Sequence, residues 1–261
     1  MMTRTGLLGL LIGGLVLLTQ QVRAEGRTVP ITTRDGVKVN VFWEPTENAT
    51  ATVLLFPGGG GGYGQVENGR PQSGNFLVRS MPHFLAEHLN VAIFGRPSDH
   101  PDLDQPERLS ERHRADVSAV LAQIKTWSDR PVWLVGTSNG TVSVAALAIG
   151  LPREAIAGAV LTSSIVGYRW QGALPRQNLA AISVPTLMLH HARDACAACR
   201  PEEVGAVFDR LSQAPVKKLI MAEGGANPKG DVCGARHWHG YIGMEREAVA
   251  LIAGWMRAPT P

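Results

Sequence analysis

Pro131-Val-Trp-Leu-Val-Gly136-Thr137-Ser138-Asn139-Gly140 is the stretch from which the fold can be read. Its apolar half predicts a strand, and the small side chains after it predict a helix. Together, Gly136, Ser138 and Gly140 make the G-x-S-x-G pattern at the junction. A serine on so tight a bend is held in a strained backbone conformation, and glycines without a Cβ let the strand and helix approach. The stretch therefore predicts an exposed serine nucleophile at Ser138.

Short apolar runs alternate with amphipathic segments on both sides of this stretch. Strands are expected at 28–33, 37–43, 51–56, 91–94, 132–135, 157–161, 185–190 and 216–221, and helices at 76–89, 107–127, 140–149, 202–211 and 244–256. A hairpin signal, Arg34-Asp35-Gly36, joins the first two strands. The later strands are almost wholly apolar, which indicates cover on both faces. The prediction is one α/β domain over residues 25–261, with a mostly parallel, doubly wound sheet and an antiparallel start.

The composition is that of an ordinary globular chain. Of its 261 residues, 44% are hydrophobic and 18% are charged, and the 29 glycines follow no collagen-like period, which excludes disordered and fibrous classes. The net charge of +3 is spread along the chain without a basic stripe, so no nucleic-acid partner is expected.

The first 24 residues predict a signal for export. Arg4 precedes an uncharged run from Gly6 to Leu18, and residues of the kind found at cleavage sites lead up to Ala24. An uncleaved anchor is the alternative, but the run would span only about 20 Å of a hydrocarbon core of about 30 Å. We expect cleavage after Ala24 and a periplasmic or secreted chain without a stable membrane anchor, in a compartment that permits disulfides.

A serine nucleophile needs a general base and a carboxylate that orients this base. Asp194 follows an apolar strand, and His239 lies between the last strand and the last helix, which gives the order serine, acid, histidine. His239 is preferred to His237 because a glycine, a tyrosine and the closing helix follow it. Asp231 is the runner-up acid, and Glu223 is a weaker rival.

A glycine-rich turn follows the early strand at 51–56, in the order Pro57-Gly58-Gly59-Gly60-Gly61-Gly62-Tyr63-Gly64. Backbone amides aimed at the oxyanion of a tetrahedral intermediate stabilise it. We expect one amide from Asn139 and a second from Gly59 or Gly60. A phosphate cradle is an alternative, but no Gly-Lys-Ser/Thr follows and no G-x-G-x-x-G opens a helix. A flexible loop without a catalytic role is the other alternative.

These residues together resemble the α/β-hydrolase superfamily, in its dienelactone-hydrolase-like, small-cap type. The glycine-rich turn, Gly136-Thr-Ser138-Asn-Gly140, Asp194 and His239-Gly240-Tyr241 carry the resemblance across nearly all of residues 25–261. The resemblance implies the family's fold and acyl-transfer chemistry by a Ser138, His239 and Asp194 triad, and we expect no cofactor and no metal. Pro57-Gly58 stands where the family commonly has His-Gly. The short link between Leu161 and Val184 leaves no room for a large cap domain.

Three cysteines lie close to the expected acid and base. Cys196 and Cys199 follow Asp194, and Cys233 precedes His239. Similar hydrolases carry cysteines at these places, which favours a Cys196–Cys233 disulfide worth roughly 3–4 kcal/mol. A Cys199–Cys233 disulfide is the rival pairing, and either pairing leaves one cysteine free. A redox pair within Cys-x-x-Cys and a zinc site shared with a neighbouring histidine are further alternatives, although a zinc site would compete with the triad.

The expected function is hydrolysis of a carboxylic ester, on a small-molecule acyl substrate, by a serine hydrolase that forms an acyl-enzyme. Amide or peptide hydrolysis by the same residues is one alternative. A non-catalytic binding protein on the same scaffold, and a metal-dependent or redox protein centred on the cysteines, are the others. The sequence leaves the acyl chain length and the oligomeric state open.

Overall fold

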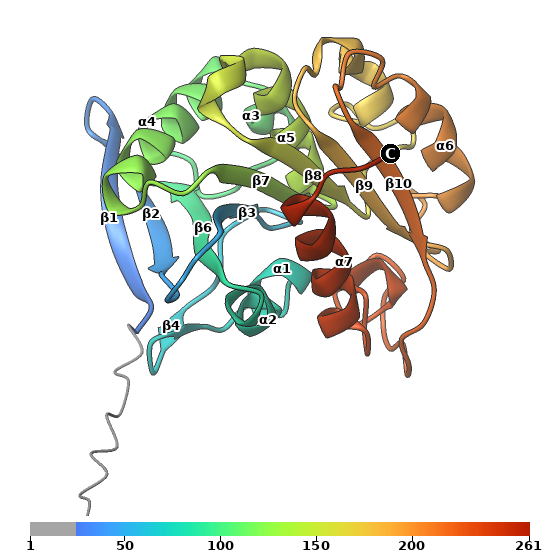
Figure 1. The fold of residues 1–261 in the computed structure, drawn as a ribbon, viewed down its shortest axis with the longest axis horizontal. Coiled ribbons are helices and arrows are strands. Elements are labelled where there is room, and N and C mark those ends of the chain that lie inside the picture. Colours follow the sequence, from blue (N-terminus) through green and yellow to red (C-terminus); the bar gives the residue numbers. More distant parts are fainter. Residues whose placement is uncertain (1–24) are drawn as a thin grey trace, which may run out of the picture.

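A computed structural model describes residues 25–261, so the expected export signal and its cleavage site lie outside the described residues. Eight strands form one sheet in the order β1-β2-β6-β3-β7-β8-β9-β10 (Figure 1). The antiparallel start consists of β1 (Arg27–Arg34), β2 (Val37–Glu44) and β6 (Leu89–Pro97). The remaining neighbours are parallel: β3 (Ala51–Phe56), β7 (Val132–Thr137), β8 (Gly158–Thr162), β9 (Thr186–His191) and β10 (Lys217–Ala222). The predicted fold class is confirmed.

Helices cover both faces of this sheet (Figure 1). One face carries α3 (Gln105–Arg108), α4 (Glu111–Trp127), α5 (Asn139–Gly150) and α6 (Pro201–Asp209), and the other carries α1 (Phe76–Arg79), α2 (Met81–Ala86) and α7 (Glu245–Arg257). Alternate residues of β3 enter opposite cores: Leu54 and Phe56 join one apolar cluster, and Val53 and Leu55 join the other. Because side chains alternate across a strand, a wholly apolar strand can fill both cores.

Two helices predicted as continuous are broken. The segment predicted at 76–89 divides at Ser80 into α1 and α2, and its last residue, Leu89, begins β6. Pro82 lies in the first turn of α2, where the missing N–H costs nothing. The segment predicted at 107–127 divides before α4, because the Ser110 hydroxyl accepts the His113 N–H at 3.0 Å and caps a new helix.

Because β3, β7, β8, β9 and β10 are parallel, their carboxyl ends lie along one edge of the sheet, the rim. A small hairpin of β4 (Val66–Glu67) and β5 (Arg70–Pro71), which the sequence did not predict, follows the glycine-rich turn. Between β8 and β9 the chain forms only two short 3-10 turns, Leu174–Arg176 and Leu179–Ala181, so no large cap is present over residues 25–261. Over residues 25–261, no helix combines the length and the hydrophobicity that a membrane span requires.

Candidate active site

Ser138 lies at a sharp bend between β7 and α5. Its φ of 52° and ψ of −126° are strained for any residue that has a side chain. Two close approaches fix the bend: a Cβ on Gly136 would lie 2.5 Å from the Gly140 carbonyl oxygen, and a Cβ on Gly140 would lie 1.9 Å from that of Phe56. Only glycine fits at either position. The bend leaves Ser138 partly exposed at the carboxyl end of β7.

Asp194 and His239 meet beyond the carboxyl end of β9. His239 Nδ1 lies 2.8 Å from Asp194 Oδ2, and the two residues are 5% and 2% exposed. The other carboxylate oxygen accepts the Cys196 N–H at 3.0 Å, and His190 Nε2 lies 3.5 Å from Oδ2. With both oxygens engaged, the carboxylate can hold the imidazole with its proton on Nδ1, which leaves Nε2 as the basic nitrogen.

The loop that carries His239 is fixed by three hydrogen bonds to other segments. Ser163 Oγ donates to the His239 carbonyl at 2.8 Å. The Tyr241 hydroxyl donates to the Leu189 carbonyl at 2.7 Å, and burial raises the pKa of Tyr241, so that it remains a donor. Arg79 donates to the carbonyl of the residue after His239. The imidazole is therefore positioned by the backbone as well as by Asp194.

The end of β8 and the residue after it contact both the Ser138 backbone and the His239 backbone, which places the two residues on the same rim. The Ser138 N–H donates to the Thr162 carbonyl at 3.1 Å, and the next residue, Ser163, holds the His239 backbone. Within residues 25–261, the side-chain hydrogen bond of His239 goes to Asp194 and not to Ser138. Such a contact is often long without substrate and tightens only in the substrate complex.

The rival residues do not join this pair. The His237 ring packs edge-on against Trp238 at 4.9 Å between centroids, and its Nδ1 is buried without a partner among the described residues. Asp231 is exposed and accepts the Cys233 N–H at 2.7 Å. Glu223 is also exposed. The geometry thus brings together the preferred acid and base.

The glycine-rich turn lies directly beside Ser138. Gly58, which the sequence did not single out, is nearest, since a Cβ on it would lie 2.9 Å from the Ser138 Cβ. The Gly59 carbonyl accepts Asn139 Nδ2 at 3.3 Å, so this glycine touches the residue after the serine. Asn139 opens α5, and the first amides of a helix have no acceptor within it. The signal that could have indicated Gly58 is that Pro57-Gly58, directly after the end of β3, stands where the family commonly has His-Gly.

A buried arginine holds this turn from behind. Arg108 is 1% exposed, and its Nη2 donates to the carbonyls of Pro57 and Gly59, both at 3.1 Å. Its Nε donates to the Leu103 carbonyl at 2.7 Å, and its Nη1 donates to Ser143 Oγ at 3.0 Å. Burial lowers the pKa of Arg108 to about 10. No sequence pattern indicates this role, because an arginine at the end of a short helix usually faces water.

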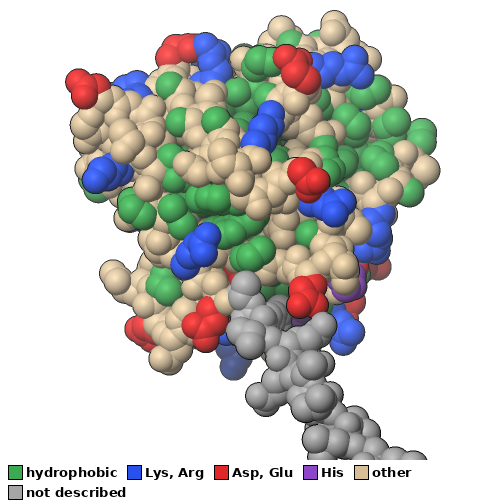
Figure 2. Space-filling view, turned by 60° about the vertical axis from the view of Figure 1, so that its left-hand side comes forward, with side chains coloured by type: hydrophobic (Ala, Val, Ile, Leu, Met, Phe, Trp, Pro, Cys, Tyr) green, Lys and Arg blue, Asp and Glu red, His purple; other side chains and the backbone are tan. Residues whose placement is uncertain are grey.

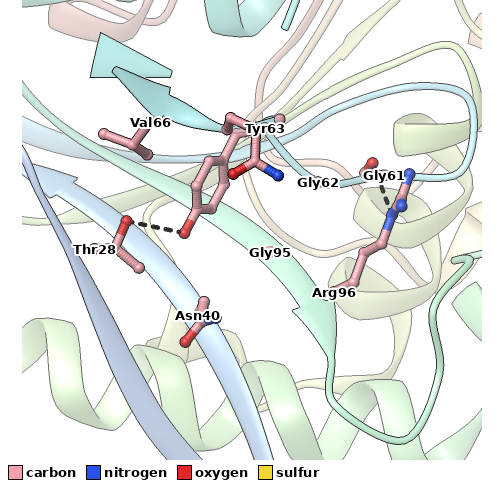
Figure 3. Close-up of a pocket in the computed structure, with 10 residues that line it drawn as sticks. Thr28, Asn40, Gly61, Gly62, Tyr63, Val66, Gly95 and Arg96 are labelled. Atoms are coloured by element: carbon pink, nitrogen blue, oxygen red, sulfur yellow. Dashed lines mark hydrogen bonds between the residues drawn. The ribbon is translucent and has the colours of Figure 1, made fainter. Parts of the chain in front are cut away.

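A cavity of about 560 Å³ lies at the far end of the turn (Figure 3). It is lined by Thr28, Asn40, Gly95, Arg96 and residues 61–66. Arg96 Nε donates to the Gly60 carbonyl at 2.9 Å, and a Cβ on Gly60 would lie 1.9 Å from Asp102 Oδ1. Gly60 therefore contacts Arg96, which lines this cavity, whereas Gly59 contacts Asn139 near Ser138. No residue of the expected triad lines the cavity.

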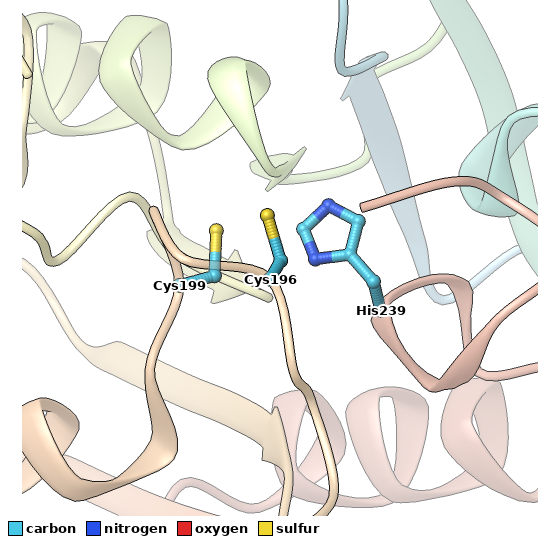
Figure 4. Close-up of side chains that lie close together, drawn as sticks. All are labelled: Cys196, Cys199 and His239. Atoms are coloured by element: carbon cyan, nitrogen blue, oxygen red, sulfur yellow. The ribbon is translucent and has the colours of Figure 1, made fainter. Parts of the chain in front are cut away.

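The cysteines lie against the acid and the base. A disulfide joins Cys196 to Cys233, with their Cα atoms 4.6 Å apart, and ties the loop of Asp194 to the loop of His239. Cys199 is free and buried, and burial raises the pKa of its thiol. The sulfurs of Cys196 and Cys199 and a ring nitrogen of His239 lie within 4.8 Å of one another (Figure 4). While Cys196 is bonded to Cys233, its sulfur is not a thiolate, so the cluster lacks one metal ligand.

Comparison with known proteins bears on the fold. Neither a family model nor a curated protein matches the sequence. Among solved structures, an esterase of Pyrococcus furiosus is 16% identical over 95% of both chains, with a TM-score of 0.63. A dienelactone hydrolase of Anabaena variabilis is 14% identical over 90% of this chain and 98% of its own, with a TM-score of 0.64. An α/β serine hydrolase without a lid from Xanthomonas campestris is 17% identical over 91% and 97%, with a TM-score of 0.57.

Proposed function

We propose that this chain, which has the α/β-hydrolase fold, is a serine hydrolase that cleaves carboxylic esters through an acyl-enzyme. The observation that carries the proposal is the buried His239–Asp194 pair on the rim where the strained bend presents Ser138. Proteins described as an esterase, a dienelactone hydrolase and serine hydrolases share the fold, which supports hydrolysis as the reaction.

In this mechanism Ser138 Oγ attacks the ester carbonyl while His239 Nε2 accepts its proton. Asp194 keeps the Nδ1 proton in place and stabilises the imidazolium that forms. His239 then gives its proton to the departing alkoxide as the carbon–oxygen bond breaks, and the acyl group stays on Ser138. Water attacks the acyl-enzyme, again with His239 as base, and the acid product leaves with Ser138 regenerated.

The oxyanion of each tetrahedral intermediate is held by the Asn139 amide and by an amide of the turn at Gly59. A helix N-terminus favours negative charge, and each amide of this kind contributes about 2.7–4 kcal/mol to lowering the barrier. Arg108 supports this arrangement by binding the carbonyls on either side of Gly58. Its role is to position the turn.

We also propose that the mature chain works outside the cytoplasm. The Cys196–Cys233 disulfide supports this location, because such bonds persist in oxidising compartments. The disulfide joins the two loops that supply the acid and the base, so an oxidising environment would preserve the proposed site. The substrate would be a small acyl ester that reaches the open rim from solvent.

The proposal is tested with Ser138→Ala on the chain without residues 1–24, using p-nitrophenyl acetate and butyrate, matched anilides and a fluorophosphonate probe. We expect kcat on esters to fall at least about 10⁴-fold and labelling to disappear. Ser164→Ala is the matched control, since the Ser164 hydroxyl is buried without a partner among the residues described. Turnover that survives in Ser138→Ala contradicts the proposal, and an unlabelled parent chain without turnover favours a binding protein.

A further inference from the structure

Three soft metal ligands are gathered beside the His239–Asp194 pair. The sulfurs of Cys196 and Cys199 and a ring nitrogen of His239 lie within 4.8 Å of one another, and all three residues are buried (Figure 4). The sulfur of Cys233 lies at the same place, because it is bonded to that of Cys196, and it would be a fourth ligand atom once the disulfide is reduced. Three cysteines and one histidine form a donor set typical of closed, tetrahedral zinc sites.

The disulfide keeps this donor set from binding metal. A disulfide sulfur carries no negative charge, so the oxidised chain offers only Cys199 and His239. Reduction by a dithiol adds two electrons and two protons to the Cys196–Cys233 bond and gives two thiols, while the dithiol becomes a disulfide. A zinc ion that binds then displaces the protons of three thiols, and the resulting thiolates provide the charge that holds it.

We propose that reduction of the Cys196–Cys233 disulfide converts this cluster into a zinc site that withdraws His239 from catalysis. Zinc–ligand bonds of about 2.0–2.3 Å require tetrahedral ligand atoms roughly 3.4–3.8 Å apart. The ligand atoms of Cys196, Cys199 and His239 must therefore approach one another by at most about 1 Å, whereas the sulfurs of Cys196 and Cys233 must move apart from a covalent bond of about 2.05 Å. Cys233 is exposed on a loop after β10, where a shift of this size disturbs little packing.

Asp194 suits the metal-bound state as well as the proposed chemistry. Histidines that bind zinc commonly donate their other N–H to a carboxylate, which fixes the tautomer. His239 Nδ1 already lies 2.8 Å from Asp194 Oδ2, so the lone pair is left on Nε2. Because Asp194 engages Nδ1, we expect zinc to bind Nε2, the nitrogen that in the proposed mechanism accepts the Ser138 proton. Metal binding and hydrolysis therefore exclude each other.

The test compares the oxidised and reduced chain, with Co²⁺ and Zn²⁺ alone as probes and a phosphine reductant that is not itself a thiol. The reduced chain is expected to bind one Co²⁺ with thiolate-to-cobalt charge-transfer bands in the near ultraviolet and the strong visible bands of tetrahedral Co²⁺. The oxidised chain is expected to show neither. Zn²⁺ should displace Co²⁺ and lower ester turnover of the reduced chain at least tenfold, and a chelator should restore it.

Two single substitutions distinguish metal binding at this site from nonspecific metal binding elsewhere on the protein. Cys199→Ala removes a thiolate and is expected to weaken zinc binding at least tenfold and to diminish the charge-transfer bands. His237→Ala is the matched control, because His237 lies outside the cluster, and its bands should equal those of the parent chain. An equal response of the two variants, or a folded, reduced chain without the bands, overturns the inference.

If the reduced chain loses its near-ultraviolet circular dichroism, it has lost its tertiary structure. The test is then made with Cys233→Ala in the presence of reductant. This variant frees Cys196 and leaves Cys196, Cys199 and His239 as ligands, so the same thiolate bands are expected, and their absence overturns the inference. The metal-binding part stands on these side chains, whereas the inhibition rests on the proposed function. Because the cobalt spectrum needs no substrate, a failure of ester turnover is distinguishable from a failure of the zinc site.

Discussion

Replacing Arg108 by methionine should impair catalysis more than stability. Within the described residues the carbonyls of Leu103 and Pro57 have Arg108 as their donor, and each buried acceptor left without a partner costs about 1–3 kcal/mol. The other two acceptors, Gly59 O and Ser143 Oγ, each keep a second hydrogen bond. The lost hydrogen bonds therefore lower the free energy of unfolding by about 2–6 kcal/mol.

Removal of the buried charge offsets much of this cost. Burial lowers the pKa of Arg108 to about 10, and a fall of that size corresponds to about 3 kcal/mol lost by the charged form. Methionine carries no charge and can fill much of the same space. The net loss of stability is therefore expected to be at most about 3 kcal/mol.

The catalytic loss is expected to be larger because, in the proposed mechanism, Arg108 fixes the turn whose amides face the oxyanion. Loss of one oxyanion donor lowers kcat by about 10²–10³-fold, and we expect a fall of this order with KM changed less than about threefold. The assay is steady-state hydrolysis of p-nitrophenyl butyrate together with urea unfolding. Arg130→Met is the matched control, since Arg130 is 51% exposed and its ion-pair partner, Asp129, is exposed as well. A folded Arg108→Met chain with near-parental kcat, or an equal fall in the control, refutes this reasoning.

Three further predictions concern the bend, the acid and a buried histidine. Gly140→Ala puts a Cβ 1.9 Å from the Phe56 carbonyl and should lower the unfolding free energy by more than about 2 kcal/mol in urea; an unchanged midpoint contradicts this. Asp194→Asn should lower kcat about 10⁴-fold, because the amide favours the wrong tautomer of His239, and a fall below tenfold argues otherwise. Burial and Arg108 lower the pKa of His113 from 6.5 to about 3, so between these values only the unfolded chain is protonated. Stability should therefore fall on acidification below about pH 6.5, and His113→Gln should reduce that slope by about 1.4 kcal/mol per pH unit in urea titrations; an unaltered slope counts against it.

The strands were more predictable than the helix boundaries. The apolar runs that became β3 and β7 mark strands because both faces are covered and no polar residue interrupts them. The helical pattern in the sequence, by contrast, continues through Ser80 and through Leu109-Ser110, where the structure interrupts each helix. Those breaks depend on local hydrogen bonds, such as the cap between Ser110 and His113, that compete with continuation of the helix.

The candidate site was predictable where chain order constrains it. Asp194 and His239 could be selected because each comes after a strand expected from the sequence, and the structure brings the two side chains together. Gly58 and Arg108 were missed because their importance depends on packing between distant segments. Arg108 and Gly59 lie 49 residues apart, and no local pattern indicates that the guanidinium enters the interior to reach a carbonyl.

The anchoring of the histidine loop has an evolutionary consequence. Because Ser163, Tyr241 and Arg79 hold that loop from behind, residues 226–232, which are largely exposed, contribute little to the alignment of the imidazole. Natural drift or directed evolution can change this stretch while the carboxylate and the imidazole stay aligned. Differences in sequence and length among relatives of this chain should therefore be most frequent in that segment.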